Sequence, residues 1–172
     1  MSATDEFIAR CVATVATDQE PAATREVVEQ ALRDQSVAKE LSLDAGVRVL
    51  HGGEDLTILH VVMPERPVGA GNPVPHNHCM WALIGVTHGS EHNRFFRRAA
   101  DTIESSSEQV IEAGEVLVMD ADAIHAVKNP STNRCSSALH VYGGDLIGAA
   151  KTMWCEADLS ELPFDFLRVI GS

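Results

Sequence analysis

Two histidines, His76 and His78, flank a single asparagine near the middle of this 172-residue chain. In an extended strand, residues i and i+2 point to the same face, about 6–7 Å apart along the strand. Two imidazoles on one face can reach one metal ion, and imidazole is a common ligand of divalent transition metals. Pro73 and Pro75 stiffen the approach to the pair. The spacing indicates a metal site, and the alternative interpretation is two polar residues at a strand edge.

A third histidine follows a turn further along the chain. Gly114 is followed by an apolar run and then by Asp120, Asp122, His125 and Asn129. This spacing resembles the second motif of the cupin family, in which Gly, five residues, Pro-x-Gly, two residues, His, three residues and Asn occur in that order. The two aspartates stand where the motif has Pro and Gly, and both suit a turn.

Residues 70–89 resemble the first cupin motif, with His76 and His78 at its histidine positions. Cupins usually place a ligand glutamate four residues after the second histidine, where this chain has Ala82. The resemblance implies a mainly β fold, the cupin double-stranded β-helix or jelly-roll barrel. It also implies a metal site formed by His76, His78 and His125, with no carboxylate ligand from the protein.

Residues 76–91 resemble one branch of the cupins, the bacterial thiol dioxygenases of the cysteine dioxygenase family. The family has His-Asp-His, then Trp, a small residue, Ile-Gly-Val and Gly-x-Glu, and this chain reads His-Asn-His-Cys-Met-Trp-Ala-Leu-Ile-Gly-Val-Thr-His-Gly-Ser-Glu. Residues 124–129 resemble the third-ligand motif of that family, and residues 139–142 resemble its Ser-x-His-x-Tyr motif. The resemblance spans about residues 45–143 and implies an oxidoreductase that inserts both atoms of O2 into a small thiol to give a sulfinate.

The resemblance assigns a catalytic role to Tyr142 and His140. On a strand the two share a face, so the phenol could donate a hydrogen bond at the metal or to a substrate carboxylate while His140 orients it. A core tyrosine satisfied by a neighbour is the alternative. The motif serine falls on Ala138, which shortens the relay to His140 and Tyr142, and Ser137 would face the other way. Ala82 lies near the cysteine that animal cysteine dioxygenases crosslink to the tyrosine, so no crosslink is expected.

Three neutral imidazoles leave open coordination positions for a thiolate, for an amine or carboxylate of the substrate, and for O2. Fe(II) is the expected cofactor, although Zn, Mn, Ni or Cu also suit imidazole ligands. Glu91 shares a strand face with Asn93 and Phe95. We expect Glu91 either behind the ligands or as a fourth ligand, as in four-ligand cupins.

Two other classes of function stay open. The turn Tyr142-Gly143-Gly144-Asp145 is typical of a less characterised cupin group described as metal-dependent enzymes. A metal cupin that does not use O2, such as an isomerase, lyase or hydrolase, would use Zn, Mn or Ni as a Lewis acid. A cupin that only binds a small ligand is the third class, although three imidazoles aimed at one point have no packing purpose.

A substrate carboxylate would be bound by an arginine, whose planar fork binds carboxylate bidentately. Arg48 lies roughly where the family has its substrate arginine, and Arg66, in the loop before the histidines, is its rival. Trp81 is a further candidate for a substrate contact, with core packing as its alternative role. The resemblance suggests cysteine, 3-mercaptopropionate or cysteamine as the thiol, and the sequence does not choose among them.

The elements that must position these residues fall into three stretches. Residues 4–35 have helical spacing, with Thr4 or Asp5 as a cap and Pro21 at a helix start. Residues 45–143 hold short β-rich runs separated by turns, which favours a sandwich or barrel. Residues 145–172 are expected to pack outside the barrel, so that residues 1–172 form one cupin domain. The strands are expected at 47–50, 56–63, 80–86, 94–96, 115–119 and 138–142.

Composition excludes several classes of partner. The 13 basic and 25 acidic side chains give a net charge of −12, which argues against nucleic acid or an anionic membrane surface as partner. No apolar run approaches ~18 residues, and the N-terminus lacks the basic region of a secretory signal. The scattered Cys11, Cys79, Cys135 and Cys155 indicate reduced thiols. We therefore expect a cytoplasmic protein with a small-molecule thiol and O2 as partners, and with homodimerisation through barrel edges, which is common among cupins.

Overall fold

The structure, a computed structural model, describes residues 1–170. The helices in this range are α1 (Ala3–Thr17), α2 (Pro21–Asp34), α3 (Ser36–Glu40) and α4 (Phe166–Ile170). The strands in the same range are β1 (Gly46–Gly52), β2 (Thr57–Met63), β3 (His76–Asn77), β4 (Ala82–His88), β5 (Ser90–Ala99), β6 (Thr102–Glu112), β7 (Val116–Met119), β8 (Ile124–Lys128), β9 (Ser136–Tyr142), β10 (Thr152–Trp154) and β11 (Glu161–Pro163).

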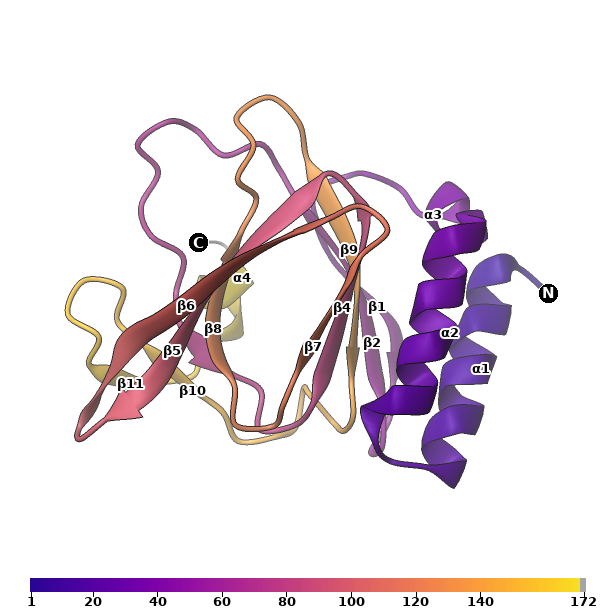
Figure 1. The fold of residues 1–172 in the computed structure, drawn as a ribbon, viewed down its shortest axis with the longest axis horizontal. Coiled ribbons are helices and arrows are strands. Elements are labelled where there is room, and N and C mark those ends of the chain that lie inside the picture. The colour runs from indigo at the N-terminus through magenta and orange to yellow at the C-terminus, as the bar shows by residue number, and fades with distance from the viewer. Residues whose placement is uncertain (171–172) are drawn as a thin grey trace.

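The strands form two antiparallel sheets that face each other (Figure 1). One sheet has the order β1-β2-β9-β4-β7, and the other has the order β11-β10-β3-β8-β5-β6. From β4 onward the chain passes back and forth between the sheets, with β4, β7 and β9 in the first and β5, β6 and β8 in the second. This alternation is the jelly-roll pattern of the double-stranded β-helix. The predicted mainly β, cupin-type barrel with N-terminal helices is confirmed.

The N-terminal helices lie together on the outer face of the five-stranded sheet, next to β4 (Figure 1). Helix α1 buries Phe7, Cys11 and Val15, which recur every four residues and so share one face. These side chains and those of α2 pack against Leu83 and Leu139 on the outer face of the sheet. The helices therefore stabilise the barrel from the side opposite its interior. No helix among residues 1–170 is long and apolar enough to cross a membrane.

The helix starts follow from local hydrogen bonding. Helix α1 begins one residue before the predicted stretch, because the Ser2 hydroxyl accepts a hydrogen bond from the Asp5 amide at 3.0 Å. The Asp5 carboxylate in turn accepts one from the Ser2 amide at 3.1 Å, which completes a capping box. Ser2 is therefore the cap, and the prediction of Thr4 or Asp5 was wrong. Helix α2 begins at Pro21, as predicted, because proline has no amide hydrogen to leave unpaired there.

The predicted β-rich runs correspond to β1, β2, β4, β5, β7 and β9, with shifted ends. Strands β6 and β8 were not predicted. The sequence of β6 is mostly polar, and its buried apolar side chains are Ile103 and Ile111. It is a strand because it pairs with β5 along its whole length, which an apolar pattern does not reveal.

The C-terminal segment extends the six-stranded sheet. Strand β10 pairs with β3, with Met153 opposite His76, and β11 pairs with β10. The Trp154 amide also donates a hydrogen bond to the carbonyl of Pro75 at 2.8 Å. Residues 152–163 therefore form an edge of the barrel beside the first two histidines, which the sequence did not predict.

Candidate metal centre

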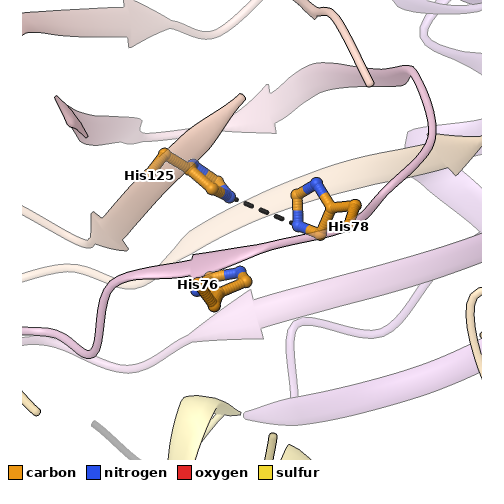
Figure 2. A group of neighbouring side chains, drawn as sticks. All are labelled: His76, His78 and His125. Carbon is orange, nitrogen blue, oxygen red and sulfur yellow. Dashed lines mark hydrogen bonds between the residues drawn. The ribbon is translucent and has the colours of Figure 1, made fainter. Parts of the chain in front are cut away.

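Three buried histidines meet inside the barrel (Figure 2). His76 and His125 lie directly opposite each other on the antiparallel strands β3 and β8, so that both rings point to the same face. His78 follows the end of β3, and its Nε2 atom lies 3.4 Å from the Nε2 atom of His125. One ring nitrogen from each histidine lies within 4.8 Å of the other two. The structure thus brings together the three residues predicted as metal ligands.

The outward-facing nitrogens of two rings are held by hydrogen bonds. The Nδ1 atom of His76 donates to the carbonyl of Val74 at 3.0 Å, since a carbonyl can only accept. The Nδ1 atom of His125 lies 2.8 Å from the Oδ1 atom of Asn93, a buried residue of β5. When Nδ1 carries the proton, the Nε2 lone pair is free to face a metal ion. The role of Asn93 was missed, although its position on the strand face of Glu91 and Phe95 was a signal for it.

The protonation state of the cluster fits metal binding. Burial lowers the pKa of His76 to about 4, and burial also lowers the pKa values of His78 and His125 well below their usual range. At neutral pH the three imidazoles are therefore uncharged, which is the form that binds metals. Two nitrogens each ~2.1 Å from one ion are about 3.0–3.4 Å apart, in agreement with the distance between His78 and His125. The donor set fits a divalent transition metal and does not identify which one.

Tyr142 and His140 share one face of β9, as their strand spacing predicted, and Tyr142 lies beside the cluster. The Tyr142 ring is 4.9 Å from the His78 ring, centroid to centroid, and its hydroxyl is 3.1 Å from Nδ1 of His140. On its other side, His140 places Nε2 at 3.4 Å from Oε1 of the fully buried Glu91. Glu91 stands behind His140 and is not part of the cluster of the three histidines among residues 1–170.

The chemistry of these three groups sets the direction of their hydrogen bonds. A carboxylate only accepts, so an ionised Glu91 requires the proton of His140 to lie on Nε2. The Nδ1 atom of His140 then accepts from the Tyr142 hydroxyl, which burial and the charge of Glu91 keep protonated by raising its pKa. The phenol oxygen is left with lone pairs that can accept a hydrogen bond from a bound molecule. This differs from the expected role of Tyr142 as a donor toward the substrate.

The serine of the family motif is replaced by Ala138, and a residue of the opposite sheet contacts His140 instead. Ala138 is fully buried between β2 and β4 and has no polar group to offer His140. Ser137 faces the helix side, as expected, where its hydroxyl lies 2.8 Å from Nε2 of His60. Glu91 from β5 is therefore the hydrogen-bond partner behind His140.

Neither predicted substrate contact reaches the interior. Arg48 is exposed and lies opposite His60 in the pairing of β1 with β2, so its side chain is on the helix side of the sheet. Trp81 donates from Nε1 to the carbonyl of Gln19 at 2.6 Å and packs on Gly143, where a Cβ atom would lie 2.0 Å from the indole ring. Neither Arg48 nor Trp81 lines the cavity beside the histidines, and Trp81 packs against the core between the helices and the sheet.

A cavity of about 720 Å³ opens beside the histidines. His76, His78, His140 and Tyr142 line its buried end. The rival arginine, Arg66, lines the more exposed end and donates to the carbonyl of Gly71 within its own loop. The motif residue Asn129 holds this loop in place, because its side-chain amide donates to the carbonyl of Pro64 at 2.9 Å. The remaining walls are mostly apolar.

No family model matches the chain. Among solved structures, an RmlC-like cupin family protein with a double-stranded β-helix fold from Methanocaldococcus jannaschii is 14% identical, with a TM-score of 0.48, over 61% of this chain and 84% of that chain. A cupin superfamily protein from Desulfitobacterium hafniense is 12% identical, with a TM-score of 0.48, over 63% of this chain and 88% of that chain. A DMSP lyase from Ruegeria pomeroyi is 19% identical, with a TM-score of 0.46, over 62% of this chain and 49% of that chain.

Proposed function

We propose that this protein is a mononuclear non-haem iron thiol dioxygenase. The reaction is RSH + O2 → RSO2H: both oxygen atoms form bonds to sulfur, the O–O bond breaks, and the thiol proton leaves with the sulfinic acid or passes to solvent. Sulfur is oxidised and O2 is reduced, so no external reductant is needed. The observation that carries the proposal is the candidate ligand set: three imidazoles at the buried end of a cavity, with no carboxylate of residues 1–170 in their cluster.

The three histidines would hold Fe(II), which supplies a position where a thiolate and O2 can meet. A site without a protein carboxylate leaves an anionic substrate sulfur as the partner that balances the charge of the ion. His76 and His78 line the cavity, so a substrate in the cavity reaches the cluster from that side. His125 lies behind them, held by Asn93.

Tyr142, His140 and Glu91 would orient the reacting thiol. Tyr142 lines the cavity, and its oxygen would accept a hydrogen bond from a bound S–H group. Its own hydroxyl donates to His140, whose second nitrogen donates to Glu91, and this favours movement of a proton away from the sulfur. The chain thus supports formation of the thiolate next to the histidines.

A metal cupin that does not use O2 is the second candidate. The same hydrogen-bonded chain of Tyr142, His140 and Glu91 suits an acid–base reaction, and a Lewis-acid metal on the three histidines would serve an isomerase, lyase or hydrolase. A cupin that only binds a ligand is less favoured, because burying three imidazoles around one point is costly without a metal.

The test starts from elemental analysis of the purified protein, followed by reconstitution with Fe(II). Oxygen consumption is then measured with a panel that includes cysteine, 3-mercaptopropionate, cysteamine and thiols with larger apolar bodies. Sulfinate formation, detected by mass spectrometry, in an amount equal to the O2 consumed is the expected result, with metal-free protein as the control. Iron-loaded protein that consumes no O2 with any thiol of the panel would falsify the dioxygenase proposal and favour the second candidate.

A further inference from the structure

The cavity beside the histidines is much larger than a small thiol requires. Its volume of about 720 Å³ lies within the ~300–1,000 Å³ range of sites that enclose drug-sized ligands. A molecule of the size of cysteine, held at the histidines, would fill only a small part of it. The rest of the cavity must therefore be explained by something other than the reacting group.

The chemistry of the walls changes along the cavity. The buried end carries the polar groups of the site, and the exposed end carries charged and amide side chains of the loop that includes Arg66. Strand β2 contributes Leu59, Val61 and Met63 to the walls, and Leu146 and Phe164 add further apolar surface. The Phe164 ring lies 6.3 Å from the His76 ring, so this apolar surface continues up to the metal cluster.

Apolar walls of this kind do not favour a strongly hydrated substrate. A small polar thiol would leave water against Leu59, Val61 and Phe164, whereas an apolar body would displace that water with a gain in free energy. Arg66 has no acidic partner among the ion pairs of residues 1–170. A polar far end of the substrate would meet Arg66, whose guanidinium also donates to the Gly71 carbonyl, together with Glu65 and Glu156, which line the same cavity.

We propose that the substrate is an amphipathic thiol whose sulfur reaches the histidines and whose apolar body, of roughly six to twelve carbons, fills the cavity. This inference rests on the proposed thiol chemistry for the identity of the reacting group. It differs from the expectation of cysteine, 3-mercaptopropionate or cysteamine, because a large cavity with apolar walls favours a thiol with a larger apolar body.

Binding is tested under anaerobic conditions, so that affinity is measured without turnover. The probes are 2-mercaptoethanol, 4-mercaptobutanol and 6-mercaptohexanol, which differ only in their methylene groups, with iron-loaded protein in a calorimeter. Each methylene buried in the cavity tightens binding about fourfold, so the longest probe should bind on the order of 100-fold more tightly than the shortest. Equal affinity across the series would overturn the inference.

A cavity-filling variant tests the location. Val61→Phe adds a ring within the cavity and should reduce the affinity for 6-mercaptohexanol at least tenfold, with little effect on 2-mercaptoethanol. Val110→Phe is the matched control, because Val110 is an exposed strand residue outside the cavity. Met63→Phe is the second variant if Val61→Phe does not retain the metal and the melting temperature of the parent. An equal loss for both probes, or no loss for either variant, contradicts the inference.

The outcomes separate this inference from the proposed function. Rising affinity with chain length, together with no O2 consumption in air, supports the apolar ligand and overturns the dioxygenase. Sulfinate formation that is fastest with cysteine or cysteamine, together with equal affinity across the series, supports the dioxygenase and overturns the apolar substrate.

Discussion

The Oε1 atom of Glu91 lies 3.4 Å from the Nε2 atom of His140, although the two residues belong to opposite sheets. Both side chains are buried, and the contact joins the interior faces of β5 and β9. Because the carboxylate is buried, loss of its contact with His140 would leave it without a partner and would also release the ring that orients Tyr142. The pair therefore gives the most direct means of separating metal binding from reactivity.

Glu91→Gln should leave the metal content unchanged and lower turnover. The amide keeps the size of the side chain but removes the charge that holds the His140 proton on Nε2. Loss of a hydrogen bond to a charged group costs about 1.5–3 kcal/mol, which corresponds to roughly 10- to 100-fold in rate if it is fully expressed in the transition state. Iron content by plasma mass spectrometry and initial rates are the measurements. A loss of metal would instead identify Glu91 as a ligand.

His78→Ala should remove bound metal while the barrel stays folded. The imidazole is one of the three candidate ligands, whereas the core of the barrel is made by apolar side chains elsewhere. His88→Ala is the matched control, because His88 is exposed at the end of β4 and should leave the metal content unchanged. The metal stoichiometry of both variants measures binding, and their circular dichroism spectra show whether the barrel is folded. Full metal occupancy in His78→Ala is the contrary outcome.

Asn93→Ala should weaken metal binding without removing a ligand. Asn93 holds the Nδ1 side of His125 at 2.8 Å, and loss of such an outer partner typically lowers metal affinity 10- to 100-fold. Competition with a chelator of known affinity measures the effect on the dissociation constant. Unchanged affinity would mean that neighbouring strands alone orient the His125 ring.

Tyr142→Phe should leave iron binding intact and lower turnover. Tyr142 is not in the histidine cluster, but like His140 it lines the cavity, and its hydroxyl lies at the end of the hydrogen-bonded chain from Glu91. Loss of a positioned group that accepts a proton from the substrate typically lowers the rate about 10²- to 10⁴-fold. Ala138→Ser is the companion variant, and it should leave turnover unchanged because both ring nitrogens of His140 already have partners in Tyr142 and Glu91. A Tyr142→Phe enzyme with the parent rate removes the phenol from the mechanism.

The metal-free protein should lose stability as the pH falls below about 6.5. An exposed histidine titrates near this value, whereas burial lowers the pKa of His76 to about 4 in the folded chain. Between these values the unfolded chain binds a proton that the folded chain does not, so the free energy of unfolding decreases as the pH falls. His78 and His125 act in the same direction.

Calorimetric melting temperatures between pH 7.5 and pH 5 measure this dependence, in a range where few carboxylates titrate. His78→Ala should give a shallower curve than the parent, and His88→Ala should give the same curve. A melting temperature that does not change over this range contradicts the expected cost of charging the buried imidazoles.

Much of the fold and the histidine cluster could be predicted because the signals are local. His76 and His78 are two residues apart, and strands with β-branched and apolar runs, such as β2 and β9, carry their signal in their own residues. Strand β6 carries no such pattern, since its strand conformation depends on pairing with β5.

The residues around the cluster depend on which strands meet. Arg48 was misplaced because the register of β1 on β2 puts it opposite His60, on the outer face of the sheet. The partnership of Asn93 with His125 requires that β5 and β8 be neighbours, and that of Glu91 with His140 requires that the two sheets face each other. The spacing of residues in the sequence does not show which strands are neighbours. Because Ala138 replaces the motif serine, the sequence predicted a relay of His140 and Tyr142 alone, whereas the structure adds Glu91.

The pairing of β10 with β3 has a consequence for the order of events during synthesis. Strand β3 has only two residues, His76 and Asn77, and one of its two neighbours is β10, about 75 residues later. The Asn77 side chain also accepts a hydrogen bond from the Thr152 amide at 2.9 Å. A chain still on the ribosome therefore exposes all three histidines before the strand that clamps the first of them has been made. The final geometry of the three-histidine cluster therefore depends on the C-terminal part of the chain, although none of the three histidines lies there.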